Sequence, residues 1–296
     1  MAFKKICPVV ATSLVWLLAS CASIGPGAGT AAPPDLAAVP VRFILSFDDG
    51  PNGRLTDNPT EKILDTLAHN TTQNGIKAIF FLQTRSSDGG ATRRGRALIR
   101  REFADGHVLA LHDASHWGHR NHRSLNDAEL VQALRDGITD LAPVLGRPVT
   151  LLRPPYWAYD ARTLAAYASH GLTVLLTDIS ANDGKDWGFK ASPRRFIHMA
   201  GEMRKVRERI DSGQIPAVDG VAPVVITFHD TNNYTAAHMQ EYLQMIVDKA
   251  RASGLTLSAQ PFYNEATSME RAALVRGRDA AHRRDMVPWW WRWMLW

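Results

Sequence analysis

Residues 41–51 read VRFILSFDDGP and place two adjacent carboxylates, Asp48 and Asp49, at the end of an apolar run. The run predicts a buried strand, and the Gly-Pro pair that follows it predicts a turn. Two side chains released by a turn at the end of a strand can reach one pocket, where one binds a metal and the other abstracts a proton. The alternative is a capped surface turn, of which Asp-Asp-Gly is also typical.

A second apolar run ends at His112, and another imidazole, His116, follows four residues later. In a helical turn this spacing places both rings on one face, and a curled loop also lets them converge. Two histidines and one aspartate form a ligand set suited to a borderline divalent cation, with an open position for water or substrate. His119 and His122 come next, so a histidine-rich surface loop is the alternative.

Polar side chains also follow three further apolar runs. These clusters are Arg153 to Tyr156 after residues 149–152, Asp178 to Trp187 after residues 172–177, and His229 with Asp230 after residues 223–228. Each cluster alone has a structural explanation, such as a surface arginine, a helix cap or a strand-end histidine. Together they form the pattern of a (β/α) barrel active site, in which polar groups gather at the carboxyl ends of successive buried strands.

Segments with helical periodicity separate these strands. They are residues 60–70, 126–145, 160–170, 192–211 and 235–252. Asn126 and Glu129 resemble a capping box, and Gly171 and Gly254 are typical helix stops. With further strands at 77–84 and 255–261, seven strands alternate with helices, which predicts an α/β fold with a parallel sheet. Because the polar clusters share one rim, we predict a barrel of seven strands.

The chain resembles the polysaccharide deacetylase family, the NodB-homology carbohydrate esterases, over about residues 41–262. Five motifs appear in the family's order: Ser46 to Gly50, His112 with His116, Arg153 with Pro155 and Tyr156, Asp183 with Asp186 and Trp187, and His229 after an apolar strand. The resemblance implies a distorted (β/α)7 barrel. It also implies metal-dependent removal of acetyl groups from an acetylated polysaccharide.

The resemblance makes Asp49, His112 and His116 the metal ligands, Asp48 the general base and His229 the general acid. The chemistry is consistent with these roles, because an amide carbonyl is a poor electrophile and a metal both polarises it and lowers the pKa of water toward ~7. We expect one divalent ion, zinc first, with cobalt or nickel as alternatives.

The remaining motif residues are expected to support these groups. By resemblance, Arg153 would orient Asp48, Asp183 would pair with Arg153, and Asp186 would hold His229. Tyr156 would offer its backbone N–H to the oxyanion. The substrate-binding residues implied are Pro155, Tyr156 and Trp187. Asp113 stands where the family usually has Ser or Thr, and its charge would either strengthen cation binding or cap a turn.

Residues 1–20 carry two lysines and then an apolar run too short for a membrane span, which predicts a secretory signal. The run ends LASC, which resembles the bacterial lipoprotein box, so Cys21 would become the lipidated first residue. An ordinary signal cleaved elsewhere is the alternative. Ala22 resembles the residue found there in Gram-negative outer-membrane lipoproteins. We therefore expect an exported lipoprotein anchored in the outer membrane and facing the periplasm.

The rest of the chain divides into three predicted parts: a flexible Ala/Gly/Pro tether at 21–40, the deacetylase domain at 41–262, and a basic, Trp-rich tail at 263–296. Cys7 belongs to the signal, so the mature chain keeps one cysteine and neither a disulfide nor thiol catalysis is expected. Tryptophan with arginine suits the lipid headgroup region, so the tail is a second candidate membrane contact. Packing of the tryptophans onto the barrel is the alternative.

The formal net charge of +5 is concentrated at the end of the chain, where residues 271–296 carry six arginines against Asp279 and Asp285. The catalytic part is close to neutral, so we expect no nucleic-acid partner. Three other functions fit some of the residues. A non-haem iron oxygenase uses two histidines and a carboxylate but leaves Asp48, Arg153 and His229 without roles. An O-acetyl esterase of the same family and a non-catalytic sugar-binding lipoprotein are the other two.

Overall fold

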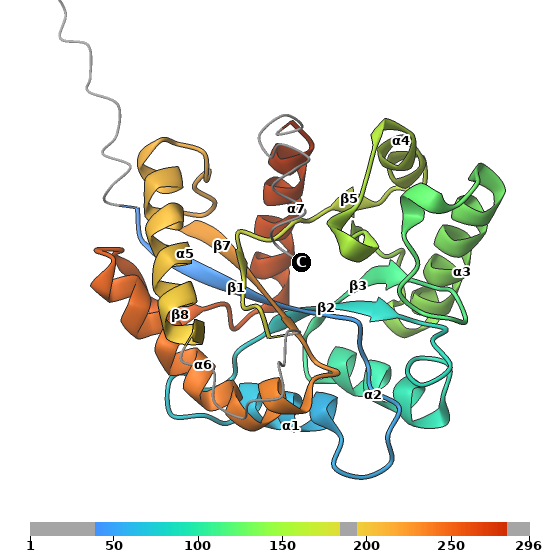
Figure 1. Ribbon diagram of the computed structural model, residues 1–296, viewed down its shortest axis with the longest axis horizontal. Helices are drawn as coiled ribbons and strands as arrows, with labels where there is room; N and C mark the ends of the chain where they lie inside the picture. Colours follow the sequence, from blue (N-terminus) through green and yellow to red (C-terminus); the bar gives the residue numbers. More distant parts are fainter. Residues whose placement is uncertain (1–38, 184–193, 283–296) are drawn as a thin grey trace, which may run out of the picture. The chain divides into compact units, whose positions relative to one another are not determined.

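The computed structural model describes residues 39–183 and 194–282, which belong to one compact unit, Asp35–Trp296 (Figure 1). The predicted signal, Cys21, most of the tether, Asp186, Trp187 and the Trp-rich end of the tail lie outside the described residues. Among the helices of the described part, none combines the length and apolar character needed to cross a membrane.

The strands form one sheet in which every pairing is parallel. They are β1 (Val41–Asp48), β2 (Ala78–Gln83), β3 (Val108–Asp113), β4 (Leu151–Leu152), β5 (Thr173–Val174), β6 (Ile179–Ser180), β7 (Ala222–His229) and β8 (Leu257–Phe262). The sheet order is β5-β4-β3-β2-β1-β7-β6, with β8 also paired to β1. The predicted parallel α/β fold is confirmed.

The predicted strand at 172–177 is shortened to β5, and a further strand, β6, follows it. β5 pairs with β4, whereas β6 pairs with β7 at the opposite end of the sheet. Residues 175–178 join them, so the two end strands of the sheet are consecutive in the chain. This segment thus links the two ends of the sheet, and the structure has eight strands where seven were predicted.

Helices lie around these strands (Figure 1). They are α1 (Pro59–Ala68), α2 (Arg93–Ala104), α3 (Asp127–Leu145), α4 (Ala161–Ser169), α5 (Arg194–Asp211), α6 (Asn233–Ala252) and α7 (Ala266–His282). The capping box of α3 forms as predicted, with the Asn126 side chain accepting from the Glu129 N–H and the Glu129 side chain accepting from the Asn126 N–H. The helices α2 and α7 were not predicted.

Alternation along the strands separates two apolar clusters. On β1, Phe43, Leu45 and Phe47 pack with the surrounding helices, whereas Ile44 faces the second cluster with residues such as Phe81. Continuing that alternation puts Ser46 and Asp48 on the same face as Ile44. The register pairs Ser46 with Thr227 and Asp48 with His229, so β7 presents its polar residues beside those of β1.

Helix α7 belongs to the folded unit. Met269, Ala272 and Ala273 are buried in the second cluster, together with Tyr263 in the preceding segment. The predicted domain boundary at 262 is therefore too early, because the inner face of the sheet needs the apolar side of α7 to cover it. The predicted tail can therefore begin only after α7, among residues that the structure does not describe.

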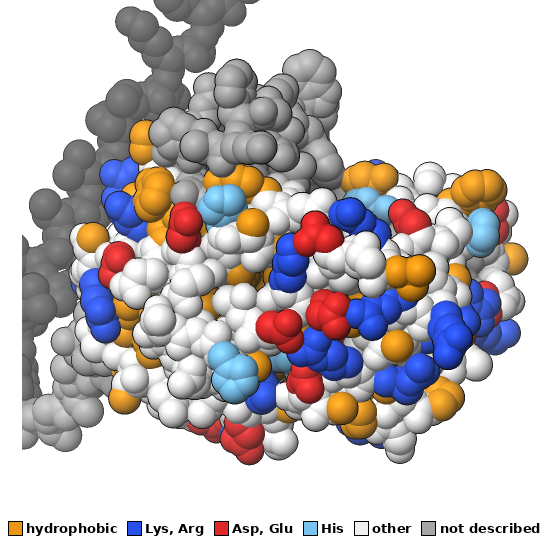
Figure 2. Space-filling model, turned by 90° about the horizontal axis from the view of Figure 1, so that it is seen from below, with side chains coloured by type: hydrophobic (Ala, Val, Ile, Leu, Met, Phe, Trp, Pro, Cys, Tyr) orange, Lys and Arg blue, Asp and Glu red, His pale blue; other side chains and the backbone are white. Residues whose placement is uncertain are grey.

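On the face shown in Figure 2, acidic and basic side chains are interspersed. Arg94 and Arg101 of α2 pair with Glu61 and Asp65 of α1, for example. These pairs neutralise Arg94 and Arg101, whereas Arg93, Arg96 and Arg100 leave α2 with a net positive charge.

Candidate active site

Arg153 forms a buried ion pair with Asp48. Its Nη1 lies 2.7 Å from Asp48 Oδ1 and 2.8 Å from Ser46 Oγ, and its Nε donates to the Leu175 carbonyl at 3.0 Å. The side chain of Arg153 is fully buried, and its guanidinium lies 4.0 Å from the centre of the Phe81 ring. Burial lowers the pKa of Arg153, and the Asp48 charge opposes that shift. The pair fixes the position of the Asp48 carboxylate.

Asp49 points into the same pocket because its backbone leaves the strand. Neighbouring strand residues face opposite sides, but Asp49 has a φ of 72°, in the left-handed region that non-glycine residues seldom adopt. Its carboxylate lies with two imidazoles, His112 and His119, and the three ligand atoms are all within 4.8 Å of one another. Burial would raise the pKa of Asp49, but the nearby histidines lower it well below its usual value.

The hydrogen bonding of His112 makes this group a candidate cation site. His112 Nδ1 donates to the Arg153 carbonyl at 2.7 Å, so in the neutral ring Nε2 carries only a lone pair. That Nε2 faces Asp49 Oδ1, another acceptor, at 3.2 Å, and it has no hydrogen-bond partner among the described residues. Burial lowers the pKa of His112, but the Asp49 carboxylate outweighs it and the net shift is upward. The pocket therefore favours positive charge between these two atoms.

His119, rather than His116, joins Asp49 and His112. His119 Nε2 lies 3.6 Å from Asp49 Oδ1, and its ring stacks between those of His112 and Tyr156, with centroid distances of 5.1 and 4.1 Å. His116 is exposed, with its ring edge-on to Trp117 at 5.1 Å. The predicted ligand set is corrected accordingly.

Asp113 explains why the four-residue spacing between His112 and His116 predicted the wrong second histidine. Its buried carboxylate accepts hydrogen bonds from the Ala114 N–H, the Ser115 hydroxyl and the Arg120 N–H. These bonds curl residues 113–120 into a closed loop instead of a helical turn, which turns His116 outward and brings His119 back. Of the two roles considered for Asp113, the structure shows the loop cap.

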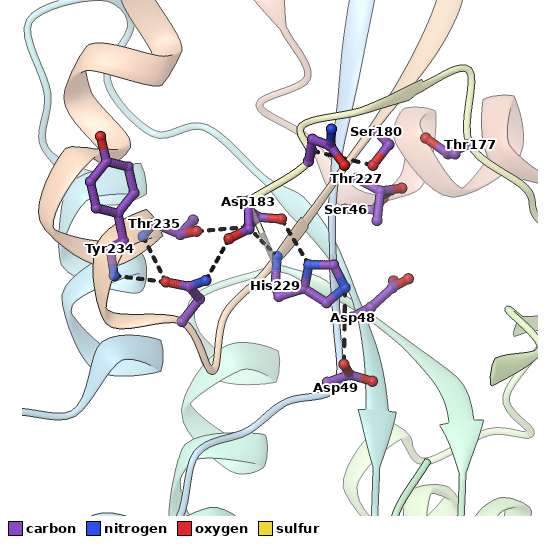
Figure 3. A network of polar contacts seen from close by, with 12 residues as sticks. Ser46, Asp48, Asp49, Thr177, Ser180, Asp183, Thr227, His229, Tyr234 and Thr235 are labelled. Atoms are coloured by element: carbon purple, nitrogen blue, oxygen red, sulfur yellow. Dashed lines mark hydrogen bonds and ion pairs between the residues drawn. The ribbon is translucent and has the colours of Figure 1, made fainter. Parts of the chain in front are cut away.

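Asp183 holds His229. The Nδ1 of His229 lies 2.8 Å from Asp183 Oδ1, while Asp183 Oδ2 accepts from the His229 N–H at 2.8 Å and from the Thr235 hydroxyl at 2.7 Å (Figure 3). The prediction that Asp183 pairs with Arg153 was wrong, because Arg153 is already bound to Asp48 on the opposite side of the pocket. Asp186, which was predicted to hold His229, lies outside the described residues.

This pairing charges His229. Burial lowers the pKa of the imidazole, but the Asp183 carboxylate, with smaller contributions from Asp48 and Asp49, raises it to about 10. Nε2 of His229 faces the pocket, 3.9 Å from Asp49 Oδ2 (Figure 3). The site therefore combines a proton donor with the Asp48 carboxylate on the neighbouring strand, and the Asp49 carboxylate lies close to the donor.

Two predicted substrate-binding residues lie at the same rim. Tyr156 has a φ of 59°, and its N–H donates to His119 Nε2 at 3.4 Å. Left-handed backbone at a bulky residue is costly and clusters at functional sites. Pro155, the residue before Tyr156, is buried. Trp187, the third predicted substrate-binding residue, is outside the described residues.

Sequence reasoning missed Gln83 as well as His119. The Gln83 side-chain amide donates to Asp49 Oδ1 at 2.8 Å. Ile79 and Phe81 belong to the inner cluster, so alternation along β2 was the signal that Gln83 also faces inward.

Comparison with known proteins agrees with this arrangement. The family model described as polysaccharide deacetylase matches residues 40–175. A chitooligosaccharide deacetylase of Rhizobium leguminosarum bv. trifolii is 32% identical over 163 residues, covering 45% of this chain and 70% of that protein. A chitin deacetylase of Pestalotiopsis sp. is 31% identical over 145 residues, and a peptidoglycan-N-acetylglucosamine deacetylase of Listeria monocytogenes is 25% identical over 202. These matches cover 49% and 68% of this chain but only 44% and 35% of those two proteins.

Solved structures match the fold. A chitin deacetylase of Colletotrichum lindemuthianum superposes with a TM-score of 0.54 at 21% identity, covering 75% of this chain and 86% of that one. A family 4 carbohydrate esterase of Streptomyces lividans gives a TM-score of 0.52 at 24% identity, covering 75% and 93%. At these identities the likeness concerns the fold alone.

Proposed function

Because this chain belongs to the polysaccharide deacetylase family, we propose that it is a metal-dependent hydrolase that removes N-acetyl groups from a polysaccharide of the N-acetylglucosamine type. One observation carries the proposal: a buried carboxylate and a carboxylate-paired histidine flank a group of one aspartate and two histidines. Such a set suits amide hydrolysis, in which a proton must leave water and another must reach the departing nitrogen.

Asp49, His112 and His119 would hold the divalent ion. A set of two imidazole nitrogens and one carboxylate suits zinc, and cobalt or nickel accept the same ligands. When bound, the ion supplies Lewis acidity, which polarises a carbonyl and makes water more acidic. The Arg153 carbonyl fixes the His112 tautomer, as outer-sphere acceptors commonly do for ligand histidines.

Asp48 would be the general base. Its ion pair with Arg153 holds the carboxylate in a fixed position on the inner face of the barrel. A positioned base of this kind typically contributes about 10²- to 10⁴-fold to a rate.

His229 would be the general acid. Its paired carboxylate, Asp183, keeps Nδ1 occupied and favours the imidazolium, so that Nε2 carries the proton on the side facing the pocket. That proton would go to the sugar nitrogen as the C–N bond breaks. The Tyr156 N–H donates to His119 Nε2 in this structure, and a cation bound at that nitrogen would free the N–H. We assign the freed N–H to the developing negative charge on the acyl oxygen.

The location of the enzyme is a separate part of the proposal. The LASC sequence and the short apolar leader support export, lipidation at Cys21 and an outer-membrane position facing the periplasm. The Ala/Gly/Pro segment before residue 41 would then tether the domain, and the Trp-rich end would be a second membrane contact.

Acetate release from three substrates tests the function: N-acetylglucosamine polymers, peptidoglycan and acetylated xylan. We expect release from one or both of the first two. Release from acetylated xylan alone would indicate the O-acetyl esterase. Binding to a polymer with no acetate released from any of them would indicate the non-catalytic sugar-binding protein.

A further inference from the structure

Trp117 is an exposed indole held beside the candidate active site. Its side chain is 85% exposed, the highest value among the large apolar residues of the described part. A single exposed apolar residue is ordinary on a protein surface, so its significance depends on its surroundings. Trp117 lies between His112 and His119 in the chain, on the loop that delivers the third member of the Asp49 group.

The loop holds Trp117 in place. The next residue, Gly118, has a φ of 71°, and a Cβ on it would lie 2.4 Å from Gln83 Oε1. The Gly118 carbonyl accepts from the Ser115 hydroxyl at 2.6 Å. Gln83 in turn donates to Asp49, so the backbone beside Trp117 rests on a side chain that touches the ligand group. The backbone that carries the indole is thus held at the active-site rim.

A groove of about 860 Å³ opens along this loop, and we call it the Trp117 groove. Its volume is within the ~300–1,000 Å³ typical of small-molecule sites. It is lined by residues 114–117 and Arg120 of the loop, by Arg85 and Ala91, and by Ala128, Glu129, Gln132, Ala133 and Asp136 of α3. One wall is therefore the active-site loop, and the opposite wall is a helix with small and polar side chains.

The charges in this groove are paired. Arg85 Nη1 lies 2.5 Å from Asp136, and Arg120 Nη2 lies 3.6 Å from Glu129. The Gln132 amide also donates to Asp136, at 2.8 Å. A groove whose cations and anions neutralise each other favours an uncharged ligand with many hydroxyl groups over a polyanion. An exposed aromatic face beside such groups offers the apolar surface of a sugar ring a stacking partner.

We propose that the Trp117 groove binds sugar units of the substrate chain distant from the residue being deacetylated, with Trp117 as the stacking platform. This inference rests on the proposed function for its ligand class, an uncharged polymer of N-acetylglucosamine. It adds a second contact for long chains that short ones cannot reach. The site thereby selects for polymer length without taking part in the chemistry.

Binding of β-1,4-linked N-acetylglucosamine oligomers tests the groove. Asp48→Asn serves as the background because it should bind without turnover, and affinities for the dimer and the hexamer are measured by calorimetry. We expect Trp117→Ala to weaken hexamer binding about 3- to 10-fold, the range of one aromatic contact, and to leave dimer binding unchanged. The Trp117→Phe variant should lose less hexamer affinity than Trp117→Ala, because it keeps an aromatic ring.

Two further variants complete the test. Ile197→Ala removes another exposed apolar side chain, 75% exposed on α5, and should change neither affinity. Ala128→Trp places bulk at an exposed position in the groove wall and should weaken hexamer binding as Trp117→Ala does. Thermal melting should show that each variant is folded.

The outcomes separate the two proposals. The proposed role of the groove would be overturned if the hexamer bound equally well with and without Trp117. It would also be overturned if Trp117→Ala weakened dimer binding as much as hexamer binding. Failure of the hexamer to bind the background protein at all would also overturn it. Trp117-dependent hexamer binding with no acetate released by the wild-type protein would leave the groove standing and remove the proposed hydrolysis.

Discussion

His112 Nε2 and Asp49 Oδ1 face each other at 3.2 Å inside the barrel, although both are acceptors once His112 Nδ1 has donated to the Arg153 carbonyl. In the neutral ring these two acceptors would repel each other, so the geometry favours a positive charge there, either a proton on Nε2 or a bound cation. Arg153 thus serves both halves of the site, because its side chain holds the base and its carbonyl orients a ligand. The predictions below test this division.

The first prediction separates the two candidate histidines. His119→Ala should lose more zinc affinity than the roughly 10- to 100-fold that an outer-sphere partner costs, since it removes a ligand. His116→Ala should bind zinc as the wild type does, because His116 is exposed and apart from the group. Titration of the metal-free proteins with zinc measures both. The reverse order would restore His116 as the ligand.

A second prediction concerns Asp113 as a positioning residue. Removing its carboxylate in Asp113→Ala frees the Ala114 and Arg120 N–H groups and loosens the loop that carries His119. Zinc affinity should fall about 10- to 100-fold. Asp113→Asn keeps one acceptor oxygen and should recover part of the loss. If Asp113→Ala melts at a lower temperature but binds zinc normally, the residue stabilises the fold only.

The pH profile tests the His229–Asp183 pair. The Asp183 charge raises the pKa of His229, so Asp183→Asn should lower it. The protonated acid would then be lost at lower pH, and the alkaline limb of kcat/KM should move toward neutrality. Thr235→Val removes one hydrogen bond to Asp183 without removing charge and should leave the limb close to its wild-type position. An unshifted limb in Asp183→Asn would show that His229 is not the titrating acid.

The buried ion pair predicts a stability change. Arg153→Met leaves Asp48 charged and buried without its partner, which should cost about 3–5 kcal/mol of the free energy of unfolding in urea. Adding Asp48→Asn removes the unpaired charge and should recover a substantial part. An equal loss in the single and double variants would mean that Arg153 acts through packing on Phe81 instead.

The sequence predicted those strands whose apolar runs end in polar, functional residues. Strand ends marked by polar clusters gave the shared rim and the parallel sheet. Helix α2 was missed because its sequence, RRGRALIRREFA, has few apolar residues, and its buried face includes Gly95 and Glu102. Helix α7 was assigned to a tail because arginines surround its small buried alanines, Ala272 and Ala273.

The site residues show a similar limit. Asp48, Asp49, His112, Arg153 and His229 were selected from strand ends, and the structure brings them to one pocket. The choice between His116 and His119 depended on the shape of the loop that Asp113 caps. The partner of Asp183 depended on which strand end lies next to it in the fold, and that is the end of β7 with His229. Such relationships arise from tertiary packing and leave little trace in local spacing.

The most direct test measures acetate release from the N-acetylglucosamine hexamer after chelation and return of zinc, in the wild type and in Asp48→Asn. We expect the chelated wild type to be inactive and zinc to restore it. Asp48→Asn should bind the same amount of zinc yet release acetate at least about 10²-fold more slowly, since a neutral amide cannot take the proton from water. Full activity in the chelated wild type, or wild-type turnover by Asp48→Asn, would contradict the mechanism.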